Sequence, residues 1–171
     1  MTPEQAAYHR LMLLAGLPEA FEQELDQALE QEDPLTPLTL ELACCMSDLN
    51  RTISVLHNHL LDHPADEHQV YDMVLADFRR RYTAGKLDAL QVCRCLTQIQ
   101  QSCDAIEPWI ELYPCLYDYE LLEEGMICDE VFRRCFRSVF LDGVELDAWA
   151  LQKEYNPKKK KSLMDFFRKK L

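Results

Sequence analysis

Residues 37–61, PLTLELACCMSDLNRTISVLHNHLL, carry the clearest periodicity in the chain. Their apolar residues are spaced alternately four and three positions apart. These residues are Leu42, Met46, Leu49, Ile53, Leu56 and Leu60. Such spacing places one apolar stripe along a helix that packs lengthwise against its neighbours. The segment therefore predicts a long central helix over about 37–61, bent near Ser47.

Helix start and stop signals recur on both sides of this segment. Thr2, with Gln5 three residues later, predicts a capping box, and Asp66 predicts another N-terminal cap. Gly16 and Gly85 stand where helices should end. No stretch shows the alternation of a strand bounded by turn pairs. The sequence predicts an all-α bundle of about six or seven helices with short connections and a short basic C-terminal helix.

The bundle is expected to form one folded domain over 1–156, followed by a basic amphipathic tail over 157–171. Asn156-Pro157 is the turn signal between them. Within the body, residues 109–125 are the least regular stretch and predict only short helical turns.

The body and the tail differ in charge more than the net charge of the whole chain suggests. The chain has 30 acidic and 18 basic residues, a net charge of −12. Seven of the basic residues lie after Asn156, so the tail carries +6 and the body −18. A body this acidic repels nucleic acid over most of its surface. It would suit a basic protein partner, as in inhibitors of basic nucleases, or simply keep the protein soluble.

The eight cysteines are expected to be reduced thiols, mostly in the core. The first residues lack the basic region and long apolar run of a signal peptide, and no stretch has the length of a membrane span. A cytoplasmic protein with free thiols follows. Cys95, Cys103, Cys128 and Cys135 fall on apolar stripes. Cys115, beside Pro114, is the cysteine we expect to be exposed.

Four histidines within twelve residues are the strongest sign of a metal site. His59 and His63 are one helical turn apart, with His57 and His68 nearby. A metal site or an enzyme built on His59, His63 and His68 is the alternative to a solvated helix end, where histidines suit the helix dipole. With only four glycines, the chain has no phosphate loop or nucleophile elbow. We expect no cofactor and no catalysis.

The tail, KKKKSLMDFFRKKL over 158–171, is the candidate binding segment. Leu163, Phe167 and Leu171 repeat every four residues among lysines, which is typical of a helix lying on an anionic membrane. The same residues would suit folding back on the acidic body, or binding a partner protein. The candidate partner-binding residues are Lys160, Lys161, Leu163, Met164, Phe166 and Phe167.

Residues 160–167, KKSLMDFF, resemble the peptide by which replication and repair proteins bind the sliding clamp PCNA. Leu163 matches the aliphatic anchor of that motif, and Phe166 with Phe167 matches its aromatic pair. Lys160 stands where the motif has glutamine. The resemblance implies an apolar plug that fills a pocket on a clamp-like partner.

Taken together, the sequence predicts a non-catalytic interaction or regulatory protein of adaptor or immunity type. Its acidic body, its basic tail, or both would bind a macromolecular partner, with a protein expected first and a membrane surface second. The sequence leaves its oligomeric state open.

Overall fold

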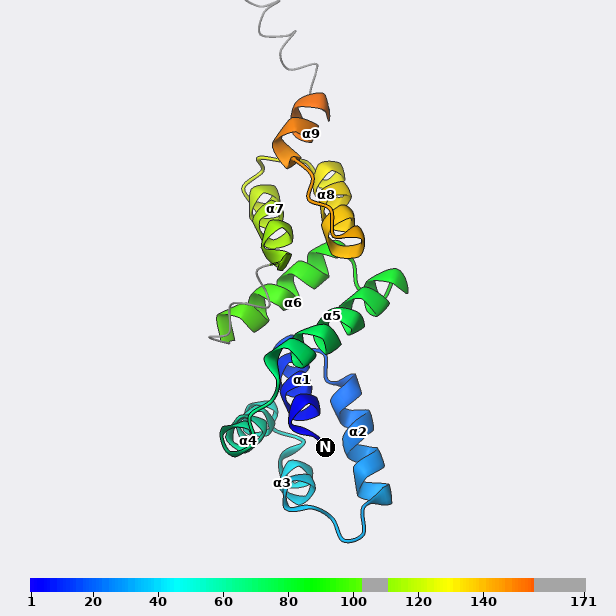
Figure 1. Ribbon diagram of the computed structural model, residues 1–171, viewed down its shortest axis with the longest axis vertical. Helices are drawn as coiled ribbons and strands as arrows, with labels where there is room; N and C mark the ends of the chain where they lie inside the picture. The colour runs from blue at the N-terminus through cyan, green and yellow to red at the C-terminus, as the bar shows by residue number, and fades with distance from the viewer. Residues whose placement is uncertain (103–110, 156–171) are drawn as a thin grey trace, which may run out of the picture. The chain divides into compact units, whose positions relative to one another are not determined.

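The computed structural model describes residues 1–102 and 111–155, and all regular structure there is helical (Figure 1). This confirms the predicted all-α class. The described residues form nine α-helices, more than the six or seven expected. They are α1 (Pro3–Leu14), α2 (Glu19–Gln31), α3 (Pro37–Cys45), α4 (Leu49–Asp62), α5 (Glu67–Thr83), α6 (Ala89–Ser102), α7 (Tyr113–Glu123), α8 (Asp129–Asp142) and α9 (Ala148–Tyr155).

The chain divides into two compact units, Met1–Ile110 and Glu111–Leu171. In the first unit α1 is the central helix, and it packs against α2, α4, α5 and α6. One apolar cluster joins α1 to α2, α3 and α4. Its buried members are Ala6, Leu13, Phe21, Leu25, Leu42, Cys45, Val55 and Leu56.

The prediction of one long helix over 37–61 is wrong, because the first helix ends at Cys45 and a second helix begins at Leu49. Asp48 has an extended backbone, and its side chain accepts a hydrogen bond from the Arg51 N–H, so it caps α4. The Thr52 hydroxyl donates to the Cys45 carbonyl at 3.0 Å, which satisfies an end group of α3.

The apolar stripe misled because it is not buried along its whole length. Leu42 and Leu56 are fully buried, one on each side of the break. Met46 and Leu49, at the break itself, are 51% and 48% exposed. Two short helices that bury the same side of the chain therefore imitate one continuous stripe.

The expected start and stop signals act as predicted. Thr2 and Gln5 form a reciprocal capping box, and the Asp66 side chain caps α5. After α5, Gly85 adopts a φ of +68°, a left-handed conformation that costs glycine little. The N–H groups of Gly85 and Lys86 then donate to carbonyls of the last turn of α5, which closes the helix.

The second unit is built on the pair α7 and α8, with α9 packed against α8. α7 corrects the expectation of short turns over 109–125. Pro114 lies in its first turn, where a missing N–H costs nothing, so it starts the helix and does not interrupt it. On α8, Phe132, Phe136 and Phe140 are fully buried at helical spacing.

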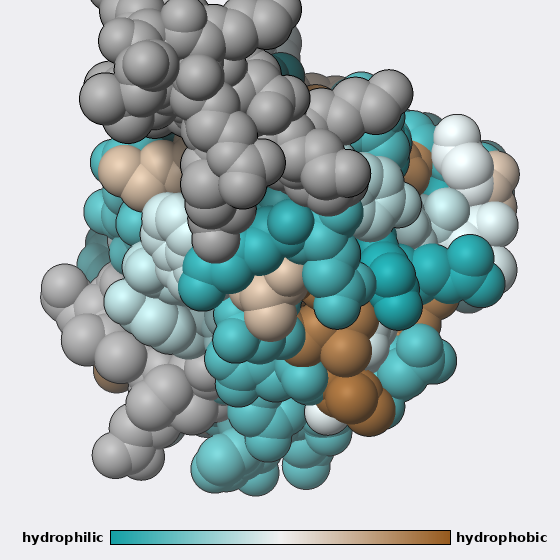
Figure 2. All heavy atoms as spheres, turned by 90° about the horizontal axis from the view of Figure 1, so that it is seen from above, coloured by the Kyte–Doolittle hydropathy of each residue, from teal (hydrophilic) through white to brown (hydrophobic). Residues whose placement is uncertain are grey.

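Large apolar side chains also reach the surface in places, Leu61, Tyr113 and Val144 among them. Figure 2 shows one face of the molecule, on which hydrophilic residues predominate around a small hydrophobic patch. Over the described ranges, none of the helices is both long and apolar enough to cross a membrane.

Candidate functional site

The predicted tail residues lie outside the described part of the chain. This applies to Lys160, Lys161, Leu163, Met164, Phe166 and Phe167, and Cys103 lies outside it as well. Their proposed roles stay predictions.

The histidine group is only partly brought together. The rings of His59 and His63 lie with their centroids 4.6 Å apart at the end of α4, whereas His68 lies in the first turn of α5. Partial burial and the neighbouring His63 lower the pKa of His59. Within residues 1–102 and 111–155, no three His, Cys, Asp or Glu side chains are grouped so that they could hold a metal ion.

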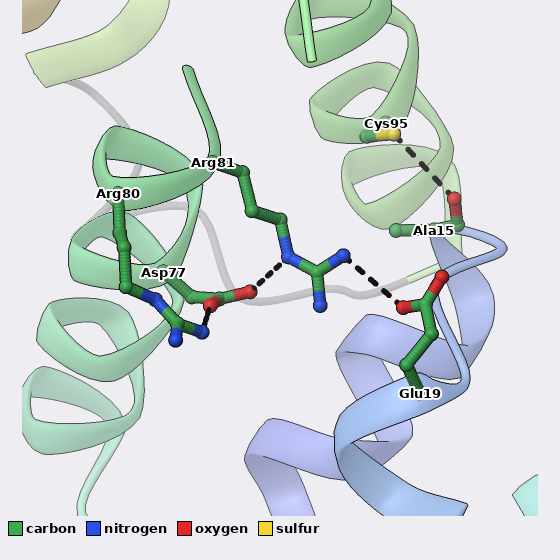
Figure 3. A network of polar contacts seen from close by, with 6 residues as sticks. All are labelled: Ala15, Glu19, Asp77, Arg80, Arg81 and Cys95. Atoms are coloured by element: carbon green, nitrogen blue, oxygen red, sulfur yellow. Dashed lines mark hydrogen bonds and ion pairs between the residues drawn. The ribbon is translucent and has the colours of Figure 1, made fainter. Parts of the chain in front are cut away.

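A polar network in the first unit centres on Asp77 of α5, which is buried (Figure 3). Arg80 and Arg81 follow it by three and four residues, the spacing that brings side chains together on a helix. Both donate hydrogen bonds to the Asp77 carboxylate, Arg81 through Nε at 2.6 Å. Burial alone would raise the pKa of Asp77, but the two arginines outweigh it and lower that pKa.

The network extends from α5 to two other parts of the unit. Arg81 also donates through Nη1 to Glu19 at the start of α2, at 3.1 Å (Figure 3). On α1, burial first and the charge of Asp77 second raise the pKa of Tyr8 to about 12. The thiol of Cys95 donates to the Ala15 carbonyl at 3.5 Å. These contacts tie α1, α2, α5 and α6 together.

A pocket of about 490 Å³ lies beside this network. It is lined by Leu17, Glu19, Ala20, Gln23, Arg80, Arg81, Ala84, Lys86 and Leu87. Three basic side chains in so acidic a body would attract an anionic group. Since Arg80 and Arg81 are already bonded to Asp77, and Arg81 also to Glu19, the arginines serve the fold first.

The second unit holds a buried carboxyl of a different kind, Asp118 of α7. Burial first and the charge of Glu145 second raise its pKa to about 6, although the Cys135 thiol donates it a hydrogen bond. Burial likewise raises the pKa of Cys135 to about 11 and that of Cys115 to about 12. Neither thiol is therefore a thiolate at neutral pH, which makes both poor nucleophiles.

The expected exposure of Cys115 is wrong, because its side chain is fully buried. It lies within the first turns of α7, where the sequence predicts only short helical turns. The predicted burial of Cys95 and Cys135 is confirmed, while Cys128 is half-buried. All seven cysteines in the described part of the chain are free thiols.

Asp118 also lines a pocket of about 360 Å³. The pocket's other residues are Tyr117 of α7, then Glu145, Leu146 and Asp147 of the loop between α8 and α9, and Ala148 and Trp149 of α9. Tyr117 and Trp149 are each 42% exposed, so two aromatic rings stand at this surface. We call this group the acid–aromatic pocket.

Sequence reasoning missed both aspartates. The D-x-x-R-R spacing around Asp77 could have been found as a helical ion-pair pattern. Asp118 gives no such signal, because it is one of many acids in an irregular-looking stretch.

Comparison with protein-family models, curated proteins and solved structures found no match to the chain.

Proposed function

We propose that this protein acts by binding a protein partner, as an adaptor or regulatory protein, and that its tail is the main binding segment. The observation that carries this proposal is the division of charge and apolar pattern in the sequence. A body of −18 precedes a tail of +6 in which Leu163, Phe166 and Phe167 are the large apolar side chains of the clamp-like motif. A charge contrast of this kind is typical of a segment that contacts another molecule.

The partner that best fits the tail is a sliding clamp or a protein with a similar apolar pocket. Leu163 and the two phenylalanines would fill the pocket as a compact anchor. Lys160 and Lys161 would then lie at its rim, where charges speed association more than they strengthen binding.

The test is capture of partners by the full-length protein and by the triple variant Leu163→Ala, Phe166→Ala, Phe167→Ala. The matched control is Leu171→Ala, which removes an apolar tail residue outside the clamp-like motif. We expect the wild type and the control to bind purified sliding clamp equally, and the triple variant to lose binding at least about tenfold, or about 1.4 kcal/mol.

Two outcomes would contradict the proposal. Equal clamp binding by the wild type and the triple variant would show that the motif does not bind the clamp. Absence of clamp binding by the wild type would show that the clamp is not the partner. The protein could instead bind anionic lipid vesicles, with Leu171→Ala weakening that binding as much as Phe167→Ala does. This result would indicate an amphipathic membrane helix, because Leu163, Phe167 and Leu171 share its apolar face.

A further inference from the structure

No basic side chain in residues 1–102 or 111–155 pairs with the buried carboxyl of Asp118. Asp77, buried to the same degree, has two arginines on its own helix. Asp118 receives its hydrogen bond from a thiol, a weak and neutral donor. A carboxylate kept from water without a positive partner is costly, so this site would gain from a cation that arrives from outside.

The acid–aromatic pocket has the right chemistry to receive such a cation. Its lining includes Asp118, Glu145 and Asp147, and no basic residue is present among these lining residues in the described chain. The rings of Tyr117 and Trp149 add faces that attract positive charge. Its volume of about 360 Å³ exceeds what a single ion needs and suits a long side chain.

We propose that the acid–aromatic pocket binds the cationic side chain of a lysine or arginine, with Asp118 as its charge partner and Tyr117 and Trp149 beside its alkyl stem. The aromatic rings distinguish this site from a mere group of acids, because an inorganic ion would not use them. Asp147 takes a secondary part, since its carboxylate already accepts a hydrogen bond from the Ala150 N–H at the start of α9.

The groups around Asp118 decide how binding depends on pH. Glu145, in the loop between α8 and α9, adds negative charge, and Cys135 of α8 faces the Asp118 carboxyl. The charge of Arg134, on α8, acts on Cys135. Cys115, one turn earlier on α7, is a neutral thiol below pH 10. Binding should therefore weaken as the pH falls through about 6, where Asp118 takes up a proton.

The cation can come from the chain's own Lys158–Lys161 or from a basic segment of another protein. The full chain with these four lysines replaced by glutamine separates the two sources. The probe is an acetylated, amidated tetralysine peptide, with tetraglutamine as its control. The readout is the indole N–H signal of Trp149 in ¹⁵N NMR spectra, identified by its loss in Trp149→Phe.

We expect tetralysine to shift the Trp149 signal saturably in the Lys→Gln protein, and tetraglutamine not to. Asp118→Asn in that protein should weaken binding about tenfold, the effect of one charge partner worth about 1.4 kcal/mol. Glu120→Gln, an exposed acid of α7 outside the pocket, makes the same charge change and should leave binding unchanged. If tetralysine binds the Lys→Gln protein more tightly than the wild type, the site belongs to the chain's own tail. If it binds both equally, the site belongs to a basic segment of another protein.

The proposal is overturned if tetralysine leaves the Trp149 signal unmoved, or if Asp118→Asn and Glu120→Gln weaken binding equally. It is also overturned if Ca²⁺ alone reproduces the shift and tetralysine does not, since the pocket would then be a metal site. The peptide titration does not depend on clamp binding by the tail, so failure of one proposal leaves the other testable.

Discussion

Asp77 in the first unit and Asp118 in the second are both 6% exposed, yet their pKa values move in opposite directions. Burial raises both. In Asp77 the two neighbouring arginines reverse the effect, whereas Asp118 meets Glu145 and a thiol. Equal burial therefore does not predict equal charge, because the identity of the neighbours decides it.

The difference can be traced to two positions on each helix. The residues three and four after Asp77 are Arg80 and Arg81, and those three and four after Asp118 are Leu121 and Leu122. Helix geometry places such residues beside the carboxyl in both cases. Asp77 thus has its countercharge on its own helix, whereas the described residues of the second unit give Asp118 none.

The largest expected effect is that of Asp77→Asn, which should destabilise the first unit by about 3 kcal/mol at pH 7. Arg81, whose side chain is 13% exposed, would lose the negative charge of its partner at 2.6 Å and keep only that of Glu19. Amide hydrogen exchange of α1 and α5 measures this loss, with α8 as a reference in the same sample.

The matched control is Asp72→Asn, which removes an exposed acid from the same helix and should change stability little. The pKa of Asp77 is lowered in the folded state, so its contribution is present above pH 4 and is lost as the pH falls further. A loss that is equal for Asp72→Asn and Asp77→Asn would refute the role of the arginines.

The same substitution at Asp118 should have the opposite effect on stability. Asp118→Asn removes a buried charge that is paired with no basic side chain among the described residues, and the new amide oxygen still accepts a hydrogen bond from Cys135. We expect the second unit to gain about 1 to 3 kcal/mol at pH 8. Urea unfolding followed by the Trp149 indole signal measures it, with Glu120→Gln as control.

The pH dependence checks the cause of this gain. The pKa of Asp118 is raised from 3.8 to about 6, so the folded state holds its proton more tightly than the unfolded chain. The penalty is absent below pH 4, grows between 4 and 6, and is complete above 6. The advantage of Asp118→Asn should follow that curve, and an advantage that persists unchanged at pH 4 would contradict the charge explanation.

Local signals allowed most helices to be predicted, and tertiary context explains the errors. The caps Thr2 and Asp66 depend on a few adjacent residues, so their side-chain chemistry is visible in the sequence. The break between α3 and α4 is not, because the stripe continues through it and only packing shows that Met46 and Leu49 are surface residues. The state of Asp118 depends on α8 and on the loop at Glu145, which no local pattern brings together.

The smallest expected effect separates the two arginines. Arg80 is 74% exposed, whereas Arg81 is 13% exposed and also contacts Glu19. Arg80→Ala should cost under about 1 kcal/mol, since ion pairs of exposed side chains contribute little. Added salt should erase this cost, because it screens exposed charges more than buried ones. Arg81→Ala should cost more and resist salt, as measured by exchange of α5 amides. Equal losses for the two variants would mean that Asp77 is held by arginine charge in general and not by the buried Arg81, and the contrast with Asp118 would then rest on charge count alone.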